Sequence, residues 1–138
     1  MTGTPARRRS QPSECTRRQV PELTQAISAA IVALYRTVYG HDRTIATTYI
    51  NDNVVVCVLE NILTEHEDLL IDGGSCGEVI DGRVAFQTDS QDEFTEAVER
   101  LTDRRVVAFL SGNQTKPGVA CELFVLDSPL SAGARTQP

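Results

Sequence analysis

Residues 44–62 read TIATTYINDNVVVCVLENI, and this stretch decides the fold. Two runs rich in β-branched side chains, Thr44–Ile50 and Val54–Ile62, flank an Asn-Asp-Asn sequence at 51–53. Because Asn and Asp tolerate the left-handed backbone that a tight turn needs, the pattern predicts a β-hairpin. The second run is apolar at both its odd and its even positions, which predicts a strand that is central or covered on both faces.

A second hairpin is predicted near the end of the chain. Val106–Leu110 and Val119–Leu126 are again rich in β-forming residues. Residues 112–118 between them are polar and contain Lys-Pro-Gly, which predicts a loop of about seven or eight residues. The last strand is apolar on both faces except at Glu122.

A long helix is predicted before the first hairpin. Apolar residues recur every three or four positions over about 22–39, which is the spacing of one helical face. Pro21 suits the first turn of a helix, and Gly40 suits its end. Because residues 26–34 are nearly all apolar, we expect this helix to be buried on more than one side, in part against a partner subunit.

Two capping boxes predict helix starts between the hairpins. Thr64 with Glu67 precedes a short apolar run, so a short helix is expected there. Ser90 with Glu93 precedes a second helical stripe over about 91–102.

The segment 72–89 stays open on its residue pattern alone. An Asp-Gly pair at 81–82 between apolar residues favours a hairpin, and glycines at 73, 74 and 77 interrupt any helix. The apolar positions do not separate the strand period from the helical one.

The element order is helix, hairpin, helices, hairpin. It predicts an α+β fold with a four-stranded, mostly antiparallel sheet built from two hairpins, and with two to four helices covering one face. Residues 20–128 are expected to form a single domain. Residues 1–19 and 129–138 are predicted to be disordered tails, the first of them basic.

Charge and composition exclude several classes of protein. The chain has 138 residues, is 41% apolar and carries a net charge of −6. Residues 1–20 carry +4 and the remainder −10, so the body repels nucleic acid, and the arginines of the tail are interpreted as solvated. No apolar run is long enough to span a membrane, and none follows the first arginines as in a signal peptide. We therefore expect a cytoplasmic protein with reduced cysteines and no membrane insertion.

Several stretches coincide in order and spacing with a known family. They are the first helix ending in Tyr39-Gly40, TYINDNVVV at 48–56, NILTEHE at 61–67, AVERLT at 97–102 and VACELFVLD at 119–127. In these stretches the chain resembles the bacterial domain of unknown function numbered 2294, over Leu23 to Asp127. The resemblance implies that 75–88 is helical, although the glycines here depart from the family pattern, and it brings no activity.

Three residues are candidates for a ligand-binding site between the sheet and segment 64–90. His66 and Glu67 lie at a predicted helix start, and Cys76 lies in the glycine-rich loop at 72–77. No spacing typical of a metal site, a phosphate loop or a nucleophilic elbow occurs, so no catalytic residue, metal or cofactor is predicted.

The leading hypothesis is a non-enzymatic association, accessory or regulatory module that acts as a homodimer or as a subunit bound to a protein partner. The strands that are apolar on both faces and the absence of a catalytic set favour it. The alternative is a small-molecule sensor or enzyme that uses His66, Glu67 and Cys76. Nucleic-acid binding through the basic tail is the third and least favoured hypothesis.

Overall fold

The structure is a computed structural model that describes residues 11–130. Its elements are helix α2 (Gln11–Tyr39), strands β1 (Ile45–Asn51) and β2 (Val54–Glu60), helices α3 (Glu65–Asp72), α4 (Cys76–Asp89) and α5 (Gln91–Thr102), and strands β3 (Val106–Thr115) and β4 (Gly118–Leu126). The strands form one sheet in the order β1-β2-β4-β3. All neighbours are antiparallel, so the predicted α+β fold built from two hairpins is confirmed.

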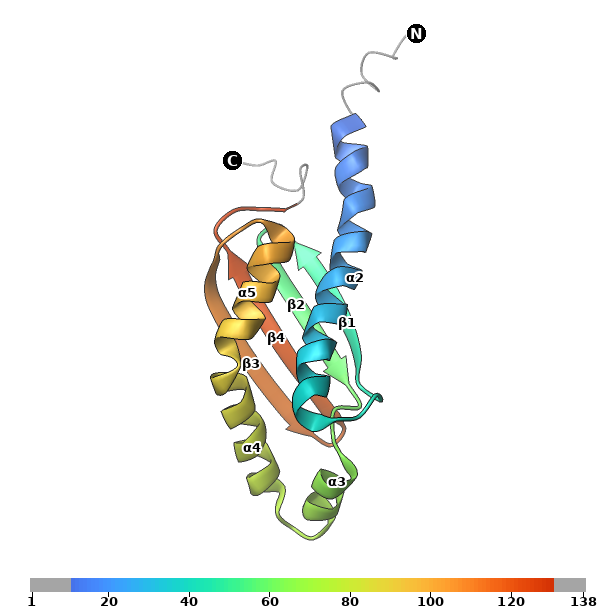
Figure 1. Cartoon of the computed structure of the whole chain (residues 1–138), viewed down its shortest axis with the longest axis vertical. Coiled ribbons are helices and arrows are strands. Elements are labelled where there is room, and N and C mark those ends of the chain that lie inside the picture. The colour runs from blue at the N-terminus through green and yellow to red at the C-terminus, as the bar shows by residue number, and fades with distance from the viewer. Residues whose placement is uncertain (1–10, 131–138) are drawn as a thin grey trace.

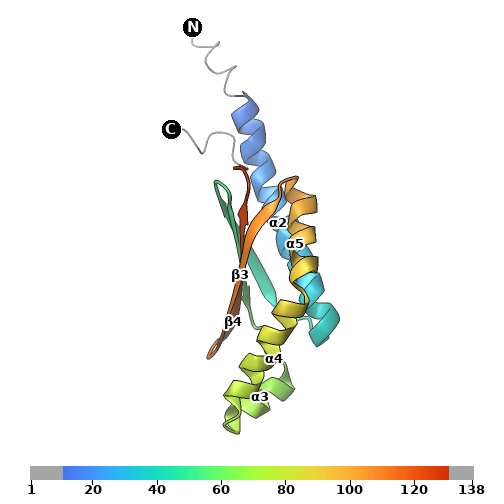
Figure 2. The ribbon, with the colours of Figure 1, turned by 90° about the vertical axis from the view of Figure 1, so that its left-hand side faces the viewer.

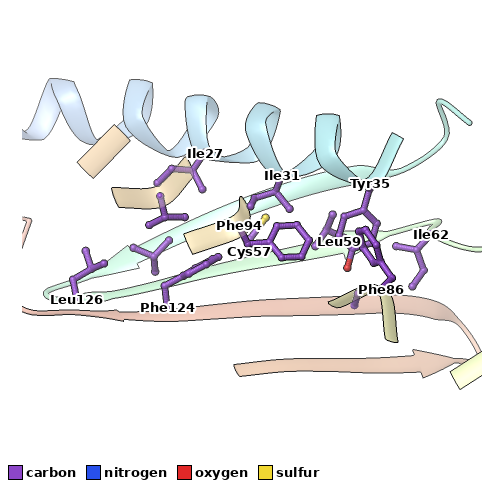
Figure 3. Packing of buried hydrophobic residues seen from close by; sticks show 13 residues of the cluster. Ile27, Ile31, Tyr35, Cys57, Leu59, Ile62, Phe86, Phe94, Phe124 and Leu126 are labelled. Carbon is purple, nitrogen blue, oxygen red and sulfur yellow. The ribbon is translucent and has the colours of Figure 1, made fainter. Parts of the chain in front are cut away.

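The helices lie on one face of this sheet. Figures 1 and 2 show α2 and α5 side by side over the strands, with α4 continuing toward one end and α3 beside it. The core lies between the helices and the sheet, where α2 contributes a buried stripe of Ile27, Ile31 and Tyr35 (Figure 3). Phe86, Phe94 and Phe124 pack against it from α4, α5 and β4.

The first helix is longer than predicted. It begins at Gln11 instead of about 22, and its first part projects beyond the sheet (Figure 1). Pro21 lies inside the helix and not in its first turn. Proline has no N–H, so it removes one backbone hydrogen bond there without ending the helix. The described helix therefore starts within segment 1–19, while residues 1–10 and 131–138 lie outside the described residues.

Segment 72–89 is helical from Cys76 to Asp89, and the hairpin alternative at 81–82 is wrong. The buried face of α4 consists of Val79, Arg83, Phe86 and Gln87, which are spaced as one side of a helix. Two of these four residues are polar. Apolar positions alone therefore could not reveal the helical period.

The second hairpin has a shorter connection than predicted. β3 extends to Thr115, so most of the expected loop at 112–118 belongs to the strand, and the turn lies at Lys116-Pro117. A register shift between Val106 and Ala108 places a bulge near the start of β3. Pairing with β4 holds the polar segment in the sheet. The composition of the segment itself does not predict this pairing.

One of the two predicted capping boxes is confirmed. The Thr64 N–H donates to Glu67 Oε1 (2.9 Å), and the Glu67 N–H donates to Thr64 Oγ1 (3.1 Å). The predicted box at Ser90 is wrong, because its side chain makes no cap hydrogen bond. Ser90 has φ −98° and ψ 7° and donates its N–H to Phe86, so it closes α4 instead of taking the extended backbone of an N-cap.

Candidate functional site

The face of the sheet that points away from the helices is apolar, and it is termed the outer face below. Strand alternation and register place the following residues on it: Ile45, Thr47, Tyr49 and Asn51 of β1, Val54, Val56, Val58 and Glu60 of β2, Val119, Cys121, Leu123 and Val125 of β4, and Ala108, Leu110, Gly112 and Gln114 of β3. Only one of these sixteen residues, Glu60, is charged.

No element of residues 11–130 covers the outer face. Figure 2 shows the helices on one side of the sheet and the other side bare. Tyr49 is 60% exposed and Leu110 is 59% exposed, on opposite edge strands, and the bulge residue Val107 is 63% exposed. A largely apolar exposed face of this kind is typical of an interaction surface.

A second feature is a buried carboxylate on the opposite, inner face of the sheet. Glu122 of β4 is fully buried and accepts three hydrogen bonds. Tyr35 Oη donates to its Oε2 (2.5 Å), Gln87 Nε2 donates to the same oxygen (2.8 Å), and Ser111 Oγ donates to Oε1. Asn113 extends the network, since its Nδ2 donates to Gln87 Oε1 (2.7 Å).

The Glu122 network contains no cation. The ion pairs within residues 11–130 are Arg36–Asp42 and Arg83–Glu67, so only neutral donors stabilise this carboxylate. Burial raises the pKa of Glu122, and the hydrogen bonds from Ser111, Tyr35 and Gln87 oppose the rise. Burial, together with the Glu122 charge, also raises the pKa of the Tyr35 phenol, which therefore stays a donor.

A shallow cleft lies where this network approaches the surface. It has a volume of about 220 Å³ and is lined by Val84, Gln87, Thr88, Gln91, Phe109 and Ser111. Ser111 lies on the edge strand β3 and is exposed, so one hydrogen bond separates the cleft from the buried carboxylate.

The third feature is a buried ion pair at the end of the core. Arg83 of α4 is 1% exposed, and its Nε and Nη2 donate to Glu67 Oε2 (2.9 Å) and Oε1 (2.5 Å). Nη2 also donates to the Ile62 carbonyl, and the guanidinium carbon lies 3.6 Å from the centre of the Tyr39 ring. Burial alone would raise the pKa of Glu67, but the hydrogen bonds from Arg83 and Thr64 outweigh it and lower the pKa. This pair fixes α4 to the start of α3.

The three residues predicted to bind a ligand have separate surroundings. Glu67 is committed to Arg83 and to the helix cap. His66 is exposed and lines a cleft of about 420 Å³ with Tyr39, His41, Arg43, Thr64 and Glu65. The Cys76 sulfur lies 3.1 Å from Thr115 Oγ1, at the end of β3. The contacts of these side chains do not join them in one site, and ligand binding by them stays a prediction.

Sequence reasoning missed the residues that carry the buried chemistry. Glu122 was visible as the one charged residue of an apolar strand, and Arg83 as the one base among twelve acids between Glu60 and Glu99. Neither pattern says which distant side chains meet these residues. Within residues 11–130, no three His, Cys, Asp or Glu side chains gather as a metal site.

One comparison with known proteins gives a match. The family model described as Na+-translocating membrane potential-generating system (MpsC) matches residues 19–128. No curated protein and no solved structure matches the chain. The match supports a small family without a specific assigned activity, and it carries the name MpsC and not the number 2294. None of the helices described in residues 11–130 is long and apolar enough to cross a membrane.

Proposed function

The chain belongs to the MpsC family, and from that premise we propose that it is a non-catalytic accessory subunit of a Na+-translocating membrane potential-generating system, which associates with protein through its outer face. The observation that carries the association is the uncovered apolar face of the sheet, with one charged residue among sixteen.

Burial of this face supplies the driving force. Removing an exposed Leu, Ile, Val or Tyr side chain from water contributes about 1.5–3 kcal/mol each. Tyr49, Leu110 and Ile45 are all more than half exposed, so their burial against a partner contributes several kcal/mol before the cost of association is subtracted.

The charge distribution leaves the outer face as the favoured contact. Twelve acids lie between Glu60 and Glu99, a segment that forms α3, α4 and most of α5. A partner that approaches this helical side meets a negative field, whereas the outer face presents almost no charge. The cytoplasmic location is part of the proposal, and the free thiols of Cys57, Cys76 and Cys121 agree with a reducing compartment.

The test is complementation in a strain that lacks its own copy of the chain. The Na+-dependent membrane potential is measured with a voltage-sensitive dye after return of wild type, Leu110→Glu or Leu69→Glu. Leu69 is 69% exposed on α3 and lies off the outer face, so its variant is the matched control. We expect wild type and Leu69→Glu to restore the potential and Leu110→Glu to fail while staying folded.

A fully active Leu110→Glu variant would contradict association through this face. The same assay tests the non-catalytic character through Glu122→Gln, which removes the carboxylate of a residue that is fully buried. We expect this variant to retain the potential. Loss of the potential with folding intact would assign Glu122 a chemical role instead.

A second candidate function is small-molecule sensing at the cleft beside His66. The cleft is lined by His41, His66 and Arg43 and by one acid, Glu65, so nitrogen donors outnumber carboxylates and an anionic ligand is the candidate. A thermal-shift screen of small anions tests this function: a saturable rise in the unfolding midpoint that His66→Ala removes supports it. A shift that His66→Ala leaves unchanged places the ligand elsewhere.

A further inference from the structure

We propose that the occupant of the outer face is a second copy of this chain, packed face to face about a two-fold axis that crosses the strands at right angles. This inference rests on the proposed function, because it names the partner of the same surface. A row here is a line of paired outer-face residues that crosses the four strands. The axis passes between two such rows. One row is Tyr49, Val56, Leu123 and Leu110, and the other is Thr47, Val58, Cys121 and Gly112.

The size of the side chains supports this axis. The first row holds large side chains that stand out from the sheet, with Tyr49 and Leu110 at its two ends. The neighbouring row ends in Thr47 and Gly112, which are small. An axis between the rows places Leu110 over the partner's Gly112 and Tyr49 over the partner's Thr47, so large residues fill the space above small ones.

Gly112 is open in the single chain. A Cβ built on it meets nothing within 4 Å, so the space above it is open to a side chain of another copy. Gly112 lies on the outer face, two residues along β3 from the exposed Leu110. A protruding residue and an open position on one strand are what an isologous interface needs, because each copy supplies both halves of the contact.

The electrostatics also favour this arrangement over an axis parallel to the strands. Glu60 lies in the row at one end of the outer face. The proposed axis places Glu60 of the partner subunit at the opposite end, three rows away along the strands. With about 3.3 Å per residue and about 10 Å between packed sheets, the two Glu60 backbones lie about 22 Å apart. A parallel axis leaves them about 11 Å apart. The two Glu60 residues therefore lie at opposite ends of the contact, where their carboxylates repel each other least.

The area of the outer face lies close to the lower limit for a specific dimer. Four strands about 4.8 Å apart and seven residues long span about 19 by 23 Å, or roughly 900 Å² for two copies taken as flat. The protruding side chains add to this flat area and bring the buried surface closer to about 1,000 Å², the size at which specific interfaces begin. We therefore expect a transient dimer with a micromolar dissociation constant.

The experiment is sedimentation velocity of the full chain across the micromolar range. Wild type and the control Leu69→Glu should dimerise with the same affinity. Gly112→Leu fits the single chain but collides with the partner's Leu110, and it should weaken dimerisation at least about tenfold. Leu110→Gly leaves a hollow and should also weaken it. The combined Leu110→Gly, Gly112→Leu variant exchanges large and small residues and should recover most of the affinity.

A monomeric wild type, a Gly112→Leu variant that dimerises like wild type, or a double variant no better than its parents each overturns the inference. Alkylation of the wild-type protein gives a second measurement without substitutions. Cys121 lies on the outer face, so its labelling rate should fall as concentration rises, whereas labelling of Cys76 should not. A Cys121 rate independent of concentration counts against the dimer.

The two proposals fail separately. If the chain stays monomeric while Leu110→Glu still abolishes the membrane potential, the outer face binds another protein, and only the dimer inference falls. If the dimer forms as described while Leu110→Glu supports the potential, the dimer stands and the proposed function falls.

Discussion

Glu122 and Arg83 are both fully buried ionisable residues, but different kinds of partner stabilise them. Arg83 has a carboxylate partner, while Glu122 has three neutral donors. The Arg83 charge lowers the pKa of its partner Glu67, whereas burial raises the pKa of Glu122 against the effect of its neutral donors. The two sites should therefore respond differently to pH and to substitution.

Glu122→Gln is expected to remove a pH dependence of stability. The folded pKa of Glu122 is raised, so the folded state binds this proton more tightly than the unfolded state. The wild-type free energy of unfolding therefore loses the contribution of this group as pH rises above about 4.3 and through the folded pKa. Urea denaturation between pH 4 and 8 should show Glu122→Gln gaining on wild type as pH rises. A constant difference would contradict the raised pKa.

Arg83→Met is expected to be strongly destabilising. It leaves Glu67 without its cation and removes the stacking on Tyr39. Breaking a buried pair by removing one partner costs about 3–5 kcal/mol. Urea denaturation at neutral pH measures the loss, with the exposed Arg100→Met as the control, which should change stability by less than about 0.5 kcal/mol. A small effect at Arg83 would show that solvent reaches Glu67.

At the scale of elements, α4 carries the largest conflict between local preference and tertiary structure. It contains Gly77 and Gly82 and has no side-chain cap at Ser75. Packing of Val79, Phe86 and the polar Arg83 and Gln87 holds it helical instead. The helix is thus stabilised by its buried face and not by its intrinsic propensity.

Gly82→Ala is expected to stabilise the protein by about 0.5–1 kcal/mol, because alanine loses less backbone entropy in a helix interior. A Cβ at Gly82 meets no atom within 4 Å, so no packing is disturbed. Thermal unfolding should show a higher midpoint. Gly74→Ala is the matched contrast: with φ +91° it is expected to lower the midpoint. A lower midpoint for Gly82→Ala would mean that α4 is not continuous at this residue.

The whole molecule separates its charge from its apolar surface. The net charge is −6, yet Glu60 is the one charged residue among the sixteen of the outer face. Two copies therefore repel at a distance and attract in contact. Because the Debye length falls from about 30 Å at 0.01 M to about 8 Å at 0.15 M salt, the repulsion depends on ionic strength more than the contact does.

Dimerisation is therefore expected to tighten a few-fold when salt is raised from about 0.01 to about 0.15 M. Sodium and potassium chloride should act alike, because screening does not distinguish the two cations. Sedimentation equilibrium in each salt measures this. Weakening with salt would indicate that opposite charges hold the interface, and a response to sodium alone would indicate a bound ion.

Much of the fold could be predicted from residues that are close in sequence. The hairpin at 44–62, the helix at 91–102 and the Thr64 capping box depend on local periodicity and turn chemistry, and each is present. Of the candidate site residues, His66 lines a cleft, whereas Glu67 is engaged in the fold. The helix over 76–89 could not be settled from its own residues, because half of its buried face is polar.

The α+β class and most element positions follow from local sequence patterns, because turns and periodicities act over a few residues. Only the tertiary structure decided the order β1-β2-β4-β3, which sheet face the helices cover, and the partners of Glu122 and Arg83. These depend on contacts between distant residues, such as Tyr35 with Glu122, which are 87 positions apart. Strands that are apolar on both faces allow either face to be covered, and helix packing chooses between them.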